Sequence, residues 1–559
     1  MTIYRHGRRP LHDYLRHHAR TTPRKPAIVW YGRRISYAEL DDLSDRFAQC
    51  LRERGVGQGD VIVLFMHNCP QFHIAQFGAQ KLGVIVSPCN PMSKAYELGH
   101  QVLEVDAAAI VCGDELLDVV QESSLLRRVE HVFAVDYGAM LPQVIAIDVP
   151  ASVRMPGEPA PLRPAFAIDF DSCVSDADPW REDVAIDLDD VALMAYTSGS
   201  TGLPKGAMLS YENALYKAAV SADGFGIDSG DVMLVETAMH HIPGMVTGLV
   251  LPIYTGATVV LLQRFDPLAV LQAIEGCKVS WWYTMAPSLP VVMGCDDAAS
   301  FDLRSLRQTV GTSFGLQLTE PLADQWRAFT GTGCLVYEAG YGLSETHTCD
   351  TIMPRDAIRW GTNGKPVPGV ELRIVDPDSG VERTTGEHGE ILLRSPVRFK
   401  GYWSRPEATQ EALLDGWTRT GDIGVVDELG YLTFLGRRKE MIKVWSYSVF
   451  PEEVEAILAT HPDVRQVAVV GAPDPNCGEA LHAYVVLNDS CAAATHREGA
   501  HETEARLIRW CMSHMAHYKV PRTVVLRHHL PATCTGKLLR RMLKSSAASA
   551  PASLRYAYR

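Results

Sequence analysis

Residues 35–113 alternate between helix-like and strand-like segments, and no other feature of the sequence constrains the fold as strongly. The stretch SYAELDDLSDRFAQCLRERG has helical apolar spacing up to Gly55, with Ser36 as the expected N-cap and Glu39 three residues later. The apolar run DVIVLFM follows, then a second helical stretch, QFHIAQFGAQKLG, and a second strand-like run, VIVSPCNP. Strand, helix and strand at this spacing predict parallel βαβ units and therefore an α/β fold.

The same alternation returns at residues 191–275, whereas residues 365–435 hold short strands separated by glycine turns. After Gly436, the acidic helix PEEVEAILATHPDV, apolar strands and the helix ETEARLIRWCMSHM indicate a small α+β unit. With 559 residues, the chain is too long for one ordinary core. We expect a large N-terminal domain, 1–438, made of two βαβ-type sheet subdomains and a β-rich subdomain. A small mobile α+β domain, 439–545, and a disordered tail, 546–559, follow it.

Charge and composition exclude several classes of function. The chain has 66 acidic and 53 basic residues, a net charge of -13, which argues against a nucleic-acid-binding surface. No uncharged apolar run reaches ~18 residues, so we expect no membrane span. The thirteen cysteines are scattered and form no CxxC pair, and the first twenty residues lack the apolar core of a secretory signal. These features predict a cytoplasmic protein with reduced thiols.

A loop rich in glycine and hydroxyl residues lies in LMAYTSGSTGLPKGAMLSYEN, residues 193–213. An apolar strand leads into Thr197–Gly202, then Lys205, and then an expected helix. Two glycines let the backbone approach a ligand closely, and four hydroxyls and one lysine suit a polyphosphate. The loop is not a Walker A motif, because Pro204 stands five residues after Gly199 where that motif needs glycine. The alternative interpretation is a flexible surface loop.

The segment YTSGSTGLPKG resembles the signature of the adenylate-forming superfamily, which includes acyl-CoA synthetases, nonribosomal adenylation domains and luciferases. GYGLSET (340–346), GWTRTGD (416–422), GRRKEMIK (436–443) and LPATCTGKLLRR (530–541) resemble its later motifs, in order. The resemblance covers residues 10–545. It implies an ATP- and Mg²⁺-dependent ligase in which a carboxylate attacks the α-phosphorus of ATP, releasing pyrophosphate and leaving an acyl-adenylate.

The resemblance also implies roles for individual residues. Glu345 would ligate Mg²⁺, Ser344 would reach the α-phosphate, and Tyr341, between Gly340 and Gly342, would stack on adenine. Asp422 would accept hydrogen bonds from the ribose hydroxyls, and Arg437 would contact the ribose. The β- and γ-phosphates would be held by Thr197, Ser198, Gly199, Ser200, Thr201, Gly202 and Lys205.

Lys537 would bridge the acid and the ATP oxygens, so the predicted catalytic residues are Lys537, Glu345 and Lys205. Lys439 resembles the hinge about which the C-terminal domain turns between two half-reactions. Taken singly, each residue has an ordinary alternative, such as a solvated loop acid for Glu345 or a tail lysine for Lys537.

The acid-binding residues implied by the resemblance are His241, Trp282, Ser313 and Phe314. Trp282 has an alternative as a core residue, the commoner fate of such aromatics. The segment HHIPGM lacks the aspartate with which amino-acid-activating domains pair an amine. We therefore expect an apolar monocarboxylic acid, whether aryl, polycyclic or fatty.

Trp445 and Ser446 stand where acyl-CoA synthetases usually have a small residue followed by glycine, along the tunnel for the pantetheine arm of CoA. An indole and an extra Cβ would overfill that tunnel. This predicts an impaired thioester step, with acyl-AMP passed to a separate acceptor enzyme or another nucleophile. The alternatives are that Trp445 turns aside and the chain is a complete acyl-CoA synthetase, or that it is a non-catalytic nucleotide-binding sensor.

Overall fold

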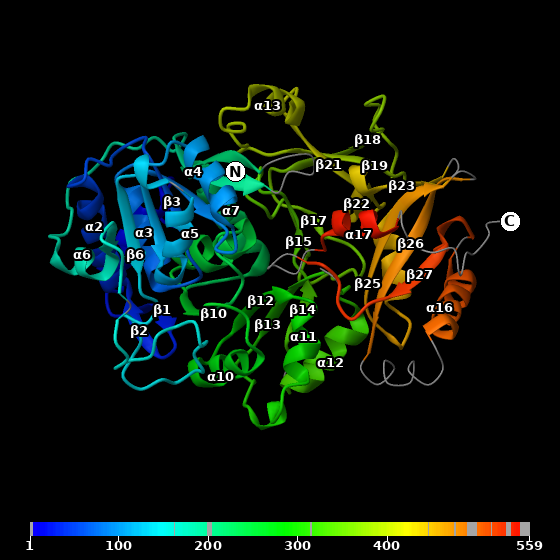
Figure 1. The fold of residues 1–559 in the computed structure, drawn as a ribbon, viewed down its shortest axis with the longest axis horizontal. Coiled ribbons are helices and arrows are strands. Elements are labelled where there is room, and N and C mark those ends of the chain that lie inside the picture. The colour runs from blue at the N-terminus through cyan, green and yellow to red at the C-terminus, as the bar shows by residue number, and fades with distance from the viewer. Residues whose placement is uncertain are drawn as a thin grey trace.

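Two seven-stranded sheets, a smaller β-rich region and a C-terminal α+β unit make up the molecule (Figure 1). The structure is a computed structural model that describes residues 4–123, 125–160, 162–197, 204–313, 316–331, 333–444, 447–474, 477–488, 500–515, 517–532 and 538–547. Within these ranges, no helix combines the length and apolar character needed to cross a membrane. The α/β fold predicted from the sequence is confirmed.

The first sheet contains the βαβ units predicted from residues 35–113. All neighbouring strands are parallel except the pair β8–β9. Ser36 caps α2 as predicted, because its hydroxyl accepts the backbone N–H of Glu39 at 3.1 Å. The strands, in sheet order, are β7 (Ala167–Asp169), β6 (His131–Val135), β5 (Ala109–Gly113), β3 (Val61–Phe65), β4 (Ile85–Cys89), β8 (Val191–Thr197) and β9 (Lys205–Ser210). The helices of this part are α2 (Tyr37–Arg52), α3 (Pro70–Lys81), α4 (Ala95–Glu104), α5 (Leu117–Glu122) and α6 (Phe170–Asp176).

The second sheet is parallel except for the pair β1–β2. The carboxyl ends of its parallel strands therefore lie along one edge, which is where α/β proteins bind ligands. In sheet order the strands are β14 (Leu335–Glu338), β13 (Gln308–Thr312), β12 (Trp281–Met285), β10 (Val232–Val235), β11 (Thr258–Leu261), β1 (Pro26–Trp30) and β2 (Arg33–Ser36). Its helices are α1 (Leu11–Thr21), α7 (Tyr211–Phe225), α8 (Ile242–Met245), α9 (Leu251–Thr255), α10 (Pro267–Cys277), α11 (Ser288–Met293) and α12 (Glu320–Thr330), with a π-helical stretch, Val246–Val250, between α8 and α9.

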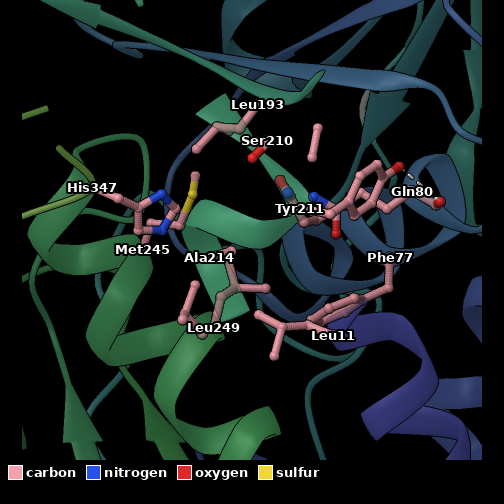
Figure 2. A pocket seen from close by; sticks show the side chains of 13 residues that line it. Leu11, Phe77, Gln80, Leu193, Ser210, Tyr211, Ala214, Met245, Leu249 and His347 are labelled. Carbon is pink, nitrogen blue, oxygen red and sulfur yellow. Dashed lines mark hydrogen bonds between the residues drawn. The ribbon is translucent and has the colours of Figure 1, made fainter. Parts of the chain in front are cut away.

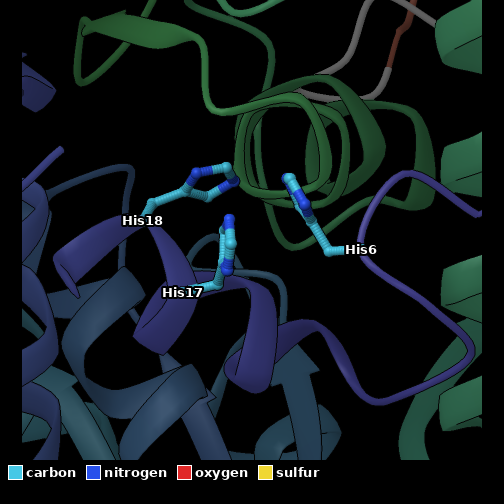
Figure 3. A group of neighbouring side chains, drawn as sticks. All are labelled: His6, His17 and His18. Atoms are coloured by element: carbon cyan, nitrogen blue, oxygen red, sulfur yellow. The ribbon is translucent and has the colours of Figure 1, made fainter. Parts of the chain in front are cut away.

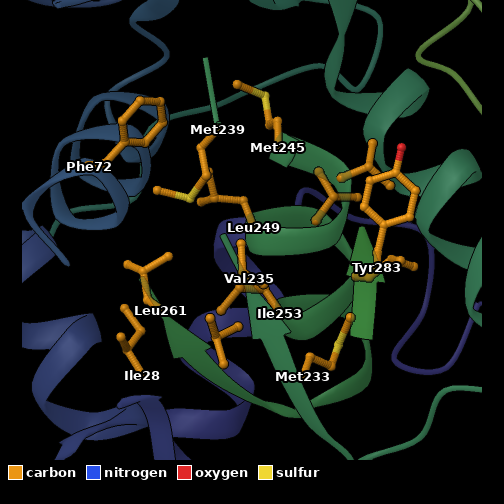
Figure 4. Close-up of a cluster of buried hydrophobic side chains, with 14 of the residues drawn as sticks. Ile28, Phe72, Met233, Val235, Met239, Met245, Leu249, Ile253, Leu261 and Tyr283 are labelled. Carbon is orange, nitrogen blue, oxygen red and sulfur yellow. The ribbon is translucent and has the colours of Figure 1, made fainter. Parts of the chain in front are cut away.

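One apolar core joins the two sheets. It includes Leu64 of β3 and Phe72 of α3 from the first half, and Met233 and Val235 of β10 from the second. Figure 4 shows side chains from α3, β10, β11 and the helical run after His241 gathered in this core. Burying one such side chain contributes roughly 1.5–3 kcal/mol, so the two halves stabilise each other as one domain.

A β-rich region follows the second sheet, as predicted, and all of its strand pairs are antiparallel. One group contains β15 (Gly340–Tyr341), β16 (Thr351–Ile352) and β17 (Lys365–Pro366). The other contains β18 (Glu371–Val375), β19 (Gly389–Arg394), β21 (Trp417–Val426), β20 (Leu413–Leu414) and β22 (Leu432–Arg437), with helix α13 (Pro406–Ala412).

The C-terminal unit has hydrophobic clusters of its own, the larger of which begins in chain order at Ile442. Its strands are β24 (Tyr447–Val449), β23 (Ile442–Val444), β26 (Gly478–Leu487), β25 (Val464–Asp474) and β27 (Thr523–Leu526). Its helices are α14 (Pro451–Leu458), α16 (Ala500–His514) and α17 (Arg540–Ala547). The predicted boundary at 438–439 falls in the short 3₁₀ turn Arg438–Glu440. In chain order, the buried residues of the large core end at Leu432, before this turn, and the C-terminal cluster begins at Ile442, after it.

Candidate functional site

The expected phosphate loop joins two antiparallel strands. Thr197 at the end of β8 pairs with Lys205 at the start of β9. The helix expected directly after Gly206 was a wrong prediction, because β9 continues to Ser210 and α7 begins at Tyr211. The backbone of β9 is paired on both sides: with β8, and with residues 400–403, where the N–H of Met208 donates to the carbonyl of Gly401 at 3.0 Å. The described residue that follows the loop with a charge suited to phosphate is Lys205, at the start of a strand rather than of a helix.

Tyr341, Asp422 and Arg437 form a compact polar group. Asp422 is 1% exposed; its Oδ2 accepts the Tyr341 hydroxyl at 2.6 Å, and its Oδ1 lies 2.7 Å from Nε of Arg437. Asp422 and Arg437 are direct partners across β21 and β22, so the strand register sets their separation. Burial and the carboxylate raise the pKa of Tyr341 well above its ordinary value, so the phenol remains a donor. Each carboxylate oxygen has two lone pairs, so Asp422 keeps acceptor sites beyond these two contacts, and its role at the ribose stays a prediction.

Strand β16 lies so close to strand β15 that only glycine fits at position 340, next to Tyr341. Gly340 has φ +143°, and a Cβ there would lie 2.0 Å from the carbonyl oxygen of Thr351. The ring of Tyr341 stacks on Phe434 with centroids 5.9 Å apart and planes 25° from parallel. The glycine and the stacked ring together fix where the Tyr341 hydroxyl lies.

Glu345, Tyr402 and Lys205 form a second group. The Tyr402 hydroxyl donates to Oε1 of Glu345 at 2.6 Å, and Nζ of Lys205 lies 5.1 Å from the centre of the Tyr402 ring. Tyr402 holds this place because residues 400–403 pair with the outer side of β9. One tyrosine thus connects the lysine of the phosphate hairpin to the carboxylate expected to bind Mg²⁺.

Arg437 links the two groups electrostatically. Burial opposes its charge, but the neighbouring Asp422, Tyr341 and Glu345 outweigh burial and raise the pKa of its guanidinium. Arg437 thus brings positive charge to Asp422 and within electrostatic reach of Glu345, where a nucleotide phosphate would need it.

The segment after Glu345 has an unusual backbone. His347, Thr348 and Cys349 have φ values of 60°, 54° and 49°, the left-handed region that such residues rarely adopt. Each costs on the order of 1–3 kcal/mol and persists only where the surroundings enforce it. Below them, the fully buried Nζ of Lys217 lies 2.6 Å from Oδ1 of Asp350 and donates to the carbonyl of Cys349 at 3.3 Å. This buried ion pair anchors the strained segment that carries Glu345.

Two buried carboxyls lie at the carboxyl ends of the second sheet. The Thr284 hydroxyl donates to Oε1 of Glu236 at 2.7 Å, and the Ser313 hydroxyl donates to Oε2 of Glu338 at 2.5 Å. Burial raises the pKa of each carboxyl to about 7. The sequence-predicted Ser313 is thus bound to Glu338, at the edge where the resemblance places the acid.

His241 lies next to His240 at the N-terminus of α8, with ring centroids 4.3 Å apart. Burial lowers the pKa of His240 well below its ordinary value, so its ring is neutral. Trp282 is fully buried and its ring packs 5.6 Å from that of Trp326, which is the environment of a core residue. The substrate roles of His241 and Trp282 stay predictions.

A small apolar cavity of about 30 Å³ adjoins the strained segment. Figure 2 shows His347 and Met245 on one side of it and Tyr211 and Gln80 on the other. His347 is 1% exposed, and neither of its ring nitrogens has a hydrogen-bond partner among the described residues. Burial lowers the pKa of His347 to about 3, so the ring is neutral. The space holds roughly two water molecules, and a larger group would enter only if flexible side chains such as Met245 moved.

Several predicted site residues lie outside the described residues: Ser198, Gly199, Ser200, Thr201 and Gly202 of the phosphate loop, Phe314, Trp445, Ser446 and Lys537. Lys439 belongs to the 3₁₀ turn Arg438–Glu440. The roles assigned to these residues stay predictions.

The donors present fit a nucleotide with a hard cation. Glu345 keeps acceptor capacity beyond its bond to Tyr402, since a carboxylate has about four lone-pair sites, and Mg²⁺ prefers one or two carboxylates plus phosphate oxygens. A Mg²⁺ ion held there would neutralise phosphate charge. Gly342 and Ser344 lie in the same segment as Glu345. A Cβ at position 342 would come within 2.6 Å of the backbone nitrogen of Cys349, so the segment packs too closely there for any residue but glycine.

Sequence reasoning missed Tyr402, Glu236, Glu338 and His347. Tyr402 stands in FKGYW, a stretch with no chemical signal, and its role arises from pairing with a strand about 195 residues earlier in the chain. Glu236 follows the apolar strand β10 and Glu338 ends the strand β14, and a glutamate at the end of an apolar run was the available signal.

Two family models match the sequence: AMP-binding enzyme over residues 15–403, and AMP-binding enzyme C-terminal domain over residues 453–537. A long-chain-fatty-acid–CoA ligase of Salmonella typhimurium is 31% identical over 534 residues, 94% of this chain and 92% of that protein. The 4-coumarate–CoA ligase 2 of rice, Oryza sativa subsp. japonica, is 30% identical over 553 residues, 97% of this chain and 93% of that protein. The o-succinylbenzoate CoA synthetase of Bacillus subtilis, solved with its acyl-adenylate, superposes with a TM-score of 0.77 at 26% identity, covering 98% of this chain and 99% of that one.

Proposed function

This chain belongs to the AMP-binding enzyme family of adenylate-forming ligases, and from that premise we propose that it activates an apolar monocarboxylic acid as its acyl-adenylate. The acid's carboxylate oxygen attacks the α-phosphorus of ATP, the bond to the β-phosphate oxygen breaks, and pyrophosphate leaves. The observation that carries the proposal is the coupled pair of groups, Tyr341–Asp422–Arg437 and Lys205–Tyr402–Glu345, joined through Arg437.

Each residue has a role that its surroundings support. Asp422 holds the ribose, and Tyr341 keeps that carboxylate in place while presenting its ring to the adenine. Arg437 and Lys205 offset phosphate charge as the leaving group departs, which is electrostatic stabilisation of the kind that dominates phosphoryl and nucleotidyl transfer. Tyr402 orients Glu345 toward the phosphates. Lys537, whose role is inferred from the sequence, supplies positive charge between the acid and ATP.

The acid is bound at the carboxyl-terminal edge of the second sheet, beside His241 and Ser313. The names of the relatives specify a long-chain fatty acid and 4-coumarate, which share a carboxylate on a largely apolar body. Glu236 and Glu338, each bound to one hydroxyl, keep further acceptor sites, so the preference for an acid without an amine is argued from the sequence HHIPGM, which lacks an aspartate.

The second half-reaction, transfer of the acyl group to CoA, is impaired in this proposal. The support is the sequence at Trp445 and Ser446, where an indole and a hydroxymethyl group replace two small residues on the pantetheine path. The acyl-adenylate would then pass to a separate acceptor enzyme or another nucleophile. The second candidate is a complete acid–CoA ligase, and the observation that favours it is the near-full-length match to proteins with that name.

Carboxylate-dependent ATP–pyrophosphate exchange tests the first step. Fatty, cinnamic-type, polycyclic and aminobenzoic acids form the panel, with acid omitted as the blank. Exchange with at least one apolar acid supports adenylation, whereas ATP binding without exchange for any acid would leave only a nucleotide-binding sensor. Adding CoA to the best acid and measuring thioester then separates the two candidates.

A further inference from the structure

Three histidines meet near the start of the chain, outside the groups described above. His6 lies in the segment before α1, and His17 and His18 are adjacent residues in the last two turns of α1. One ring nitrogen from each lies within 4.8 Å of the other two. Figure 3 shows the three rings turned toward one another from these two segments. Within the part of the chain that the structure describes, this is the group of histidine, cysteine and acidic residues whose atoms could share one metal ion.

The backbone that carries His6 is fixed by hydrogen bonds. The N–H of Arg5 donates to the Tyr254 hydroxyl at 3.2 Å, and the Tyr14 hydroxyl donates to the carbonyl of Gly7 at 2.8 Å. Arg9 donates through Nε to the carbonyl of His6 at 2.6 Å. The segment therefore holds the His6 ring against α1 before any ligand arrives, which lowers the entropic cost of completing a site.

The His18 ring is also fixed. Its Nε2 lies 3.0 Å from the carbonyl oxygen of Ile253 in α9, and a Cβ added at Gly256 would come within 2.8 Å of the ring atom Cε1. A carbonyl oxygen beside a ring nitrogen is the outer partner that metal-ligating histidines usually have. The carbonyl oxygen of Ile253 can accept the proton of Nε2 as a hydrogen bond while Nδ1 of His18 binds the metal. Alternatively, this oxygen can itself bind the ion.

Divalent transition metals bind histidine through a nitrogen of the neutral imidazole ring.

The ordinary interpretation is a packed histidine cluster, since the rings of His6 and His17 lie 4.0 Å apart at 30°. Both rings are half-buried and their nitrogens are not among the buried atoms that lack a partner, so the feature that distinguishes the cluster is the approach of one nitrogen from each ring to within 4.8 Å of the other two. The guanidinium groups of Arg5 and Arg9 keep their charge and oppose a cation, and the carboxylate of Asp223, 3.9 Å from Arg5, offsets one of them. Small rotations of two half-buried rings would bring the nitrogens to the separation that a tetrahedral ion needs, since Zn–N bonds are ~2.0–2.1 Å.

We propose that His6, His17 and His18 form a binding site for one divalent transition-metal ion, with Zn²⁺ as its expected occupant. Three neutral nitrogens without a carboxylate select a borderline metal over Mg²⁺ or Ca²⁺, and the remaining position is open to water or a carbonyl oxygen. The ion would clamp the segment before α1 to that helix and to α9. Because α9 continues the helical run that begins at His241, the clamp would steady the far end of the run that starts at the expected acid pocket.

The test is a Zn²⁺ titration of the chelator-treated full-length protein, competed against a chromophoric chelator. We expect one equivalent bound tightly by the parent, with affinity at least about tenfold lower in His6→Ala and in His17→Ala. These two side chains are only half-buried, so the substitutions leave the core intact. His528→Ala is the matched control, because His528 and His529 form an exposed adjacent pair, and it should bind Zn²⁺ like the parent.

Two further measurements distinguish the site from incidental binding. Zn²⁺ should raise the midpoint of thermal unfolding of the parent but not of His6→Ala. Co²⁺ bound by the parent should show the visible bands of a tetrahedral nitrogen and oxygen site without a thiolate charge-transfer band, since the chain has thirteen cysteines. Equal Zn²⁺ affinity of parent and His6→Ala, an equal loss in His528→Ala, or a thiolate band would each overturn the proposal. None of these readouts depends on adenylation.

Discussion

Replacing Tyr402 with phenylalanine tests whether one hydroxyl orients the expected Mg²⁺ ligand. The change removes the 2.6 Å bond to Glu345 but keeps the ring beside Lys205. A hydrogen bond to a charged acceptor contributes ~1.5–3 kcal/mol. Because 1.36 kcal/mol is a factor of ten in rate, Tyr402→Phe should lower kcat/KM for adenylation about 10–150-fold.

The assay is ATP–pyrophosphate exchange measured across a Mg²⁺ titration. The Mg²⁺ concentration for half-maximal rate should rise, while KM for the acid should change little, because Tyr402 touches Glu345 and Lys205 rather than the sheet edge. Tyr431→Phe is the matched control. Tyr431 also donates to a protein acceptor, the carbonyl of Ala357, and lies under the cation of Lys365, yet it belongs to neither group of the site.

A double-mutant cycle with Glu345→Gln decides the question. If the hydroxyl acts through Glu345, Tyr402→Phe should cost far less activity in the Glu345→Gln background than in the parent. Fully additive losses, or an unchanged Mg²⁺ requirement in Tyr402→Phe, would refute the positioning role.

Three other predictions concern the chemistry, the CoA path and pH. Lys537→Ala should lower the adenylation rate, measured by pyrophosphate exchange, ~10²–10³-fold. ATP binding, measured by nucleotide titration, should change little. An adenylation rate equal to that of the parent enzyme would contradict the assignment. Trp445→Ser with Ser446→Gly should gain acyl-CoA formation without loss of pyrophosphate exchange, and rapid thioester formation by the parent would disprove the block. Burial raises the pKa of Glu236 from 4.5 to about 7, so the folded state holds this proton more tightly than the unfolded state does. The stabilisation is complete below pH ~4.5 and is lost as the pH rises through 7, by up to about 3 kcal/mol. Glu236→Gln should flatten that decline in a pH series of thermal unfolding, and an unchanged slope would count against the buried acid.

The sequence by itself determined the α/β class and the positions of most helices and strands. Ser36 capped α2 as predicted because a hydroxyl three residues before a glutamate satisfies a backbone donor locally. The strands at 61–65 and 85–89 and the helix between them followed from apolar periodicity, which depends on near neighbours. Ordered motifs likewise placed Tyr341, Glu345, Asp422 and Arg437, which the structure brings together.

Only the tertiary structure decided how distant segments complete the site. A strand, β9, rather than a helix follows the phosphate loop and pairs with β8, and residues 400–403 pair with the outer edge of β9 and bring Tyr402 to Glu345. The raised pKa of Glu236, and a His347 ring with no hydrogen-bond partner among the described residues, follow from burial by elements far away in sequence. Local pattern fixes how a segment folds because its hydrogen bonds and capping are local. Which residues a side chain contacts depends on packing between distant segments, and the apolar periodicity of one segment does not indicate that packing.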